Sequence, residues 1–181
     1  MRLLLTVSLL PLLAAAGFAQ ASSSSASVHC DLTAGKLSRD GKLVRAGGHV
    51  KAKAEALDLA ADQATCNTET GEVELLGHVQ AVLPARADHS VFRYGSATFV
   101  TDKSVSIAAD RLVVKTGLLQ GWGHLVIRGL DPVSQEVELR GDEMYMFLRT
   151  ADATVSGNIK VSGSYKGPAA RRLVFPPDVV K

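Results

Sequence analysis

Three histidines share one sequence context. His49, His78 and His124 each follow a glycine and precede an aliphatic residue at the start of an alternating run. If the strands that carry them were neighbours, the imidazoles would form a ladder able to hold a metal ion. Their phase is opposite to that of the aliphatic residues, which places them on an outward face where any polar side chain serves. Asn158 holds the fourth such position, so the sequence favours a structural role and predicts no metal and no cofactor.

Three aspartates recur in the same regular way. Asp62, Asp110 and Asp142 each follow a small residue some distance before one of these glycines. Acid–base catalysis needs one unique cluster, whereas a residue repeated in every unit usually turns or caps its backbone. The sequence also lacks a nucleophile elbow, a His-Glu-x-x-His pair and a phosphate-binding glycine loop. We therefore predict that the chain is not an enzyme.

The two cysteines occupy matched places. Cys30 lies five residues before Gly35, and Cys66 lies five residues before Gly71. Matched positions on neighbouring strands share a face, which makes the pair a candidate disulfide in an oxidising compartment. Two half-buried thiols are the alternative, and the spacing fits no zinc motif.

The elements that position these residues are strands. The repeated glycines at 48, 77, 123 and 157 are 29, 46 and 34 residues apart, so turn lengths vary and strict solenoid periodicity is absent. The runs that follow them alternate with period two, which predicts an all-β meander of antiparallel strands. The segment Val50 to Ala64 also has a helical composition, but Val50, Ala52 and Ala54 alternate and favour a strand.

The chain begins with an export signal. Arg2 precedes an uncharged run from Leu3 to Ala16, and small residues follow it. We expect cleavage after Ala19 or Ala21, with an uncleaved signal anchor as the alternative. The expected organisation is a signal peptide at 1–21, a serine-rich spacer at 22–27, one β domain at 28–165 and a proline- and arginine-containing tail at 166–181. A net charge of +2 without a basic block argues against nucleic-acid binding.

The repeat unit resembles that of the OstA-like (LptA-like) periplasmic lipopolysaccharide-transport family. That family's units consist of Ala-Asp, a short strand, a turn, and Gly-Asn-Val or a close variant. The resemblance covers about Val28 to Tyr165, with histidine in place of the usual asparagine in three units. The matching segments run from Ala61-Asp62 to Gly77-His78-Val79, from Ala109-Asp110 to Gly123-His124-Leu125, and from Gly141-Asp142 to Gly157-Asn158-Ile159.

The resemblance implies an open, twisted β-jelly roll of antiparallel strands in two facing sheets. Between the sheets, an apolar groove would carry the acyl chains of lipid A across the periplasm, from the inner to the outer membrane. The same side chains could instead fill a sandwich core. The inward positions given by the alternation are Val50, Ala52, Val79, Ala81, Leu83, Val105, Ile107, Leu125, Ile127, Val137, Leu139, Ile159 and Val161.

The expected partners follow from the same resemblance. They are lipopolysaccharide or a related glycolipid, and the inner-membrane and outer-membrane members of the same transport system. Head-to-tail self-assembly would join the last strands, near Ile159 to Tyr165, to the first strands of another copy, near Val28 to Leu32. An exported β-sandwich scaffold or adhesin without lipid cargo is the rival interpretation. The aromatic residues Phe92, Tyr94, Phe99 and Trp122 either plug an end of the groove or lie at its lip.

Overall fold

The structure contains only strands as regular elements. The computed structural model describes residues 31–131, 133 and 137–164, so the predicted signal peptide, serine-rich spacer and C-terminal tail lie outside the described residues. The predicted all-β class is confirmed, including for Val50 to Ala64. The strands are β1 (Asp31–Thr33), β2 (Lys36–Asp40), β3 (Leu43–Ala54), β4 (Leu57–Asn67), β5 (Val73–Leu83), β6 (Ser90–Tyr94), β7 (Ala97–Thr101), β8 (Val105–Lys115), β9 (Leu118–Arg128), β10 (Glu138–Phe147), β11 (Asp152–Ser156) and β12 (Lys160–Ser162). Among the described residues, no helix is long and apolar enough to cross a membrane.

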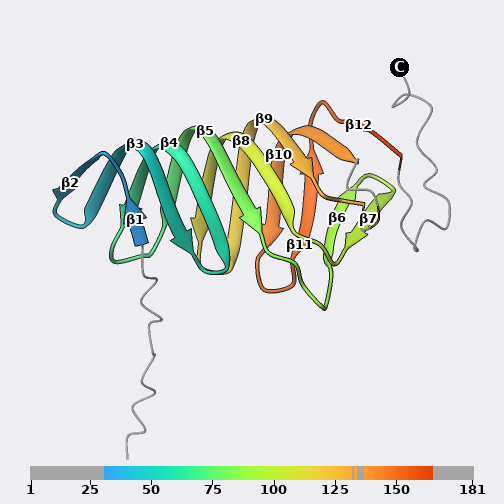
Figure 1. Cartoon of the computed structure of the whole chain (residues 1–181), viewed down its shortest axis with the longest axis horizontal. Coiled ribbons are helices and arrows are strands. Elements are labelled where there is room, and N and C mark those ends of the chain that lie inside the picture. The colour runs from blue at the N-terminus through green and yellow to red at the C-terminus, as the bar shows by residue number, and fades with distance from the viewer. Residues whose placement is uncertain (1–30, 132, 134–136, 165–181) are drawn as a thin grey trace, which may run out of the picture.

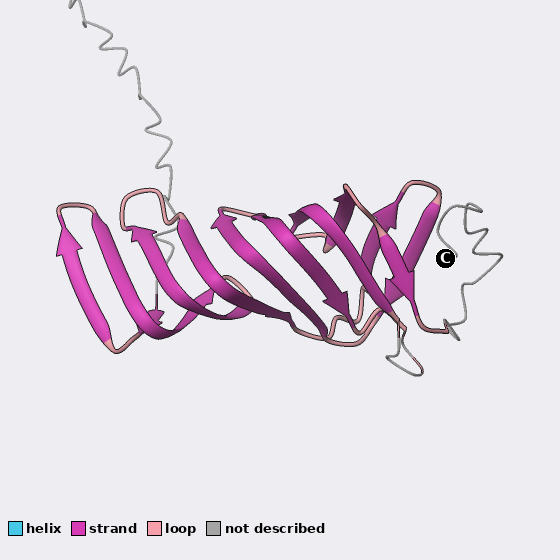
Figure 2. Ribbon diagram, turned by 90° about the horizontal axis from the view of Figure 1, so that it is seen from above, coloured by secondary structure: helices cyan, strands magenta, loops and turns pink. Residues whose placement is uncertain are grey.

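All twelve strands belong to one sheet. Its main path runs β1-β3-β4-β5-β8-β9-β10-β11-β6-β7, with β2 beside β3 and β12 beside β10. All strand pairs are antiparallel except the pair of β6 and β11, which is parallel. Seen from above, the strands lie side by side and obliquely to the long axis of the molecule (Figure 2). The two facing sheets expected from the sequence are therefore two layers of one continuous sheet.

The layers arise because the long strands arch over (Figure 1). In β4, Leu59 and Ala61 are buried, the next two residues are exposed, and burial resumes at Ala64. Two outward residues in succession reverse the phase of the alternation, so both halves of the strand direct apolar side chains into the same interior. The same reversal occurs in β8 at Asp110 and in β10 at Asp142.

We name the two layers by their place in the repeat. The repeat wall consists of the half-strands that follow the repeated glycines or precede the repeated aspartates, and the opposite wall consists of the remaining halves. Strand β1 pairs with Lys51–Lys53 and extends the repeat wall, whereas β2 pairs with Leu43–Gly47 and extends the opposite wall. At the other end, β12 and β11 divide in the same way along β10.

The interior is one hydrophobic cluster with two different ends. At one end, the β6–β7 hairpin folds back on β11, and its cross-strand pair Phe92 and Phe99 is fully buried in the cluster. At the other end, Leu37 on β2 pairs with Ala46 and shares its inward face, yet it is 57% exposed. The hairpin therefore closes one end of the roll. At the other end, none of the described residues covers Leu37.

Candidate functional site

A row of β-bulges marks the crest where the strands arch over. On β3, Gly48 and His49 together lie opposite the single residue Asp62 of β4, because the register shifts between Gly47 and Val50. Equivalent shifts place Gly77 and His78 opposite Asp110, and Gly123 and His124 opposite Asp142. Gly157 and Asn158 lie between β11 and β12. An extra residue in one strand bends that strand and increases its local twist. The repeat recognised in the sequence is thus the device that folds the sheet into two walls.

Three of the four repeated glycines, Gly77, Gly123 and Gly157, are required for two physical reasons. Gly77 has a φ of +74°, a left-handed conformation that costs other residues energy. A Cβ added to Gly77 would also lie only 2.6 Å from Oδ2 of Asp62, which folds over the glycine. The same crowding joins Gly123 to Asp110 and Gly157 to Asp142. This contact explains why glycine and aspartate recur together in the sequence.

The residue after each of these three glycines binds the same aspartate. Nδ1 of His78 lies 2.7 Å from Oδ2 of Asp62, and the equivalent atoms of His124 and Asp110 are also 2.7 Å apart. In the fourth unit, the backbone N and the Nδ2 of Asn158 donate to Asp142 at 2.9 and 2.8 Å.

These contacts are on the outer surface. The side chains of His78 and His124 are 92% and 91% exposed, as the alternation predicted for an outward face. The hydrogen bond and charge of Asp62 raise the pKa of His78 above 6.5. In the described part of the chain, no three His, Cys, Asp or Glu side chains converge as metal ligands. Asp62 and Asp110 thus contact the side chain of the residue after the glycine, and Asp142 also accepts a hydrogen bond from the backbone of Asn158.

The thirteen inward positions predicted from the sequence all belong to the repeat wall. Eleven of them are at most 5% exposed, and Ile159 and Val161 are partly buried against the same cluster. Water does not reach the eleven, so the walls are in contact at these positions in this conformation. An acyl chain could enter only if the walls separated, or at the end where Leu37 is exposed.

The opposite wall was missed by the sequence reasoning. A signal was available, because Val73-Glu74-Leu75 alternates before the glycine of its unit as clearly as Val79-Gln80-Ala81 does after it. What the sequence did not reveal is that the phase changes at the crest, so that both sets face inward. The buried members of the opposite wall are Ala46, Ala64, Cys66, Val73, Leu75, Leu112, Val114, Leu119, Met144, Met146, Ala153 and Val155.

The aromatic residues divide between the plugged end and the outer surface. Phe92 and Phe99 are fully buried and plug the β6–β7 end, and Tyr94 packs partly buried beside them. Trp122 lies on the outer face of β9, where the guanidinium of Arg111 stands 5.0 Å from its ring centroid.

Cys66 is fully buried on the opposite wall and engaged in a disulfide bond. Cys30, the other cysteine of the chain, lies outside the described residues, so the Cys30–Cys66 pairing stays a prediction.

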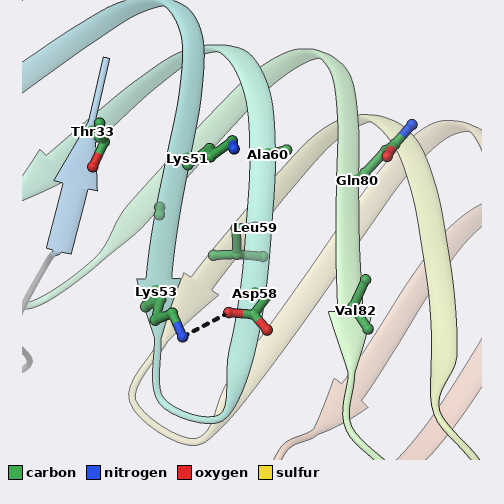
Figure 3. A pocket seen from close by; sticks show the side chains of 9 residues that line it. Thr33, Lys51, Lys53, Asp58, Leu59, Ala60, Gln80 and Val82 are labelled. Atoms are coloured by element: carbon green, nitrogen blue, oxygen red, sulfur yellow. Dashed lines mark ion pairs between the residues drawn. The ribbon is translucent and has the colours of Figure 1, made fainter.

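A shallow hollow of about 570 Å³ lies on the outer face of β3, β4 and β5. Ala60 leaves space between Lys51 and Gln80, and Lys53 is paired with Asp58 at 3.2 Å across the same surface (Figure 3). These side chains alternate with those of the repeat wall and point away from the interior. The hollow is thus separate from the apolar space between the walls.

Solved structures include one with this architecture. The crystal structure of LptH from Pseudomonas aeruginosa, the LptA-homologous periplasmic component of the conserved lipopolysaccharide transport device, aligns with a TM-score of 0.50. The chain has an LptA-like fold. The alignment covers 83% of this chain and 91% of LptH at 9% sequence identity. No protein-family profile and no curated protein sequence matches this chain.

Proposed function

We propose that this protein is a periplasmic carrier that shields the acyl chains of lipopolysaccharide, or of a related glycolipid, between its two walls. The observation that supports this most strongly is a continuous apolar interior, folded from a single sheet by a repeated bulge, in an LptA-like fold. The similar protein LptH is a component of a lipopolysaccharide transport device.

Burial of an acyl chain would offset part of the free energy needed to separate the walls. A chain of about twelve methylenes gains about 10 kcal/mol at about 0.8 kcal/mol each, as an upper bound. Such binding is non-directional, so it needs no catalytic or metal-binding constellation. The carrier is therefore expected to act without a cofactor.

The walls should separate most easily between β3 and β5. Alanine side chains bury less apolar area than leucine, isoleucine or methionine, so walls lined by alanine lose less contact when they part. This region also adjoins the end where Leu37 is exposed. Six of its inward side chains are alanines: Ala46, Ala52, Ala54, Ala61, Ala64 and Ala81.

The proposed head-to-tail assembly must use a reduced surface at one end. Strand β6 already pairs with Asp152–Thr154 of β11, so that edge is occupied. Within the described residues, the predicted contact near Ile159 to Tyr165 is therefore left with the edge of β12. Partners on the inner and outer membranes would meet the same two ends of the roll.

The test is a charge placed between the walls. Ile107 is 1% exposed, and Ile107→Asp would set a carboxylate against acyl chains, so loading with lipopolysaccharide should be lost. Gln80→Lys on the outer face is the matched control and should load normally. Because Ile107→Asp would also destabilise a packed core that binds no lipid, the unfolding midpoint must be measured for both variants. Normal loading by a folded Ile107→Asp protein would refute the carrier function and favour the scaffold interpretation.

A further inference from the structure

The outer face of β9 and β10 carries three aromatic side chains. Tyr145 and Phe147 are 41% and 53% exposed, and their rings meet edge to face with centroids 5.2 Å apart. The register sets Tyr145 opposite Gln120 and Glu143 opposite Trp122. Trp122 and Tyr145 are therefore diagonal neighbours on one surface. We call Trp122, Tyr145 and Phe147 the aromatic face.

Two pairs of charged side chains lie beside the aromatic face, and the exposed Glu143 lies opposite Trp122. Nε and Nη2 of Arg111, which stands over Trp122, donate to Oε1 of Glu74 at 2.8 and 2.7 Å. On the other side, Nη1 of Arg93 donates to Asp152 at 2.7 Å. These pairs hold donors and acceptors in fixed positions while their charges cancel. The face thus combines the exposed rings of Tyr145 and Phe147 and the half-buried ring of Trp122 with two neutral ion pairs and the carboxylate of Glu143.

This combination fits one class of ligand. A phosphate or an anionic lipid headgroup would need an unpaired cation, and both arginines here are engaged. A protein partner usually covers a continuous apolar core, whereas here rings alternate with polar groups such as Gln120 and Thr154. A sugar ring presents an apolar face of C–H groups and an edge of hydroxyls. Aromatic side chains offer a large apolar surface to the C–H face of the sugar, and the paired ions can form hydrogen bonds with its hydroxyl groups.

We propose that the aromatic face binds a neutral saccharide chain. The site lies outside the two walls, so it does not depend on lipid entering the interior. It adds to the proposed function a second, polar contact for a glycolipid, and it rests on that function only for the source of the saccharide.

The test uses Trp122, the only tryptophan of the chain, as its own reporter. The full chain is titrated with two neutral saccharides, maltoheptaose and a dextran oligosaccharide. Binding should shift Trp122 emission to shorter wavelength and protect it from acrylamide quenching. Tyr145→Ala and Phe147→Ala should each weaken binding about threefold to tenfold. Leu37→Ala removes an equally exposed apolar side chain on β2 and should change nothing.

Three results would overturn the proposal. Trp122 emission and quenching could stay constant with both saccharides while calorimetry shows no heat of binding. Binding could occur but remain unchanged in the Tyr145→Ala and Phe147→Ala proteins, which would place it elsewhere. Trp122 could instead become protected as the protein concentration rises without saccharide, which would make the face a contact between copies. A fluorescent fatty acid titrated in parallel reports on the interior alone, so failure of the carrier function would be seen separately.

Discussion

The bulge row can be tested by adding one methyl group at two matched glycines. Gly77 and Gly48 occupy the same place in their bulges and have nearly the same backbone conformation, with φ values of +74° and +77°. They differ in what lies above them. A Cβ on Gly77 would meet Oδ2 of Asp62 at 2.6 Å, whereas a Cβ on Gly48 would meet nothing within 4 Å. The pair separates backbone strain from crowding by the aspartate.

Gly48→Ala should lower the free energy of unfolding by about 1–2 kcal/mol, the cost of the left-handed conformation for alanine. Gly77→Ala carries that cost and must also push Asp62 out of its rotamer, which adds about 0.5–1.5 kcal/mol. We therefore expect about 2–3 kcal/mol for Gly77→Ala. Urea denaturation measures both changes, provided that the slope of unfolding against urea is the same in all variants.

A double-mutant cycle assigns the difference. In the Asp62→Ala background, the Gly77→Ala substitution no longer displaces a carboxylate, so its cost should fall to that of Gly48→Ala. The coupling free energy between positions 62 and 77 should be about 1 kcal/mol. Equal destabilisation by Gly77→Ala and Gly48→Ala, or a coupling near zero, would refute the idea that aspartate and glycine recur because they touch.

Three further predictions concern charge, disulfide and plug. NMR titration should give His78 a pKa above 6.5, and the pKa should return toward 6.5 in the Asp62→Asn variant. Because folding raises the pKa of His78, its interaction with Asp62 stabilises the fold below pH 6.5, and this stabilisation is lost as the pH rises through the folded-state pKa. An unshifted His78 would contradict this. Thiol labelling of the denatured, non-reduced protein should find no free thiol at Cys30 or Cys66, and reduction should destabilise the fold by about 3–4 kcal/mol in the chain-entropy model; two labelled thiols would refute the pairing. Phe92→Ala should cost about 3–5 kcal/mol because the side chain is fully buried, whereas a cost below 1 kcal/mol in a denaturation experiment would show that the hairpin does not plug the end.

The sequence predicted the inward residues of the repeat wall, but it predicted neither the opposite wall nor the arch that brings the two together. Period-two alternation depends only on neighbouring residues, so it identified the strands and placed Val79 and Ile107 inward. The arch of each strand depends on contacts between strands. The alternation of residues within a single strand does not reveal where that strand bends. The sequence therefore marked Asp62 and Gly77 as repeated residues without revealing that Asp62 lies over Gly77 at the crest.

The sequence left open whether Phe92 and Phe99 plug an end of the groove. Nothing local indicates that β6 pairs in parallel with β11, about sixty residues later along the chain. The burial of Phe92 follows from that long-range pairing. The sequence also did not show which way Trp122 points. Gly121 faces the interior, where an added Cβ would lie 2.8 Å from Leu112, so its neighbour Trp122 faces outward.

The most direct test of the carrier function is photo-crosslinking from both walls in cells. A photoreactive amino acid is placed at Leu125 on the repeat wall, at Leu75 on the opposite wall and at Gln80 on the outer face. Leu75 and Leu125 are at most 1% exposed, whereas Gln80 is exposed. The account predicts lipopolysaccharide adducts from Leu125 and from Leu75, and none from Gln80. If the folded proteins gave no adducts from either wall, or adducts from Gln80 alone, lipid would not travel between the walls, and the carrier function would be contradicted.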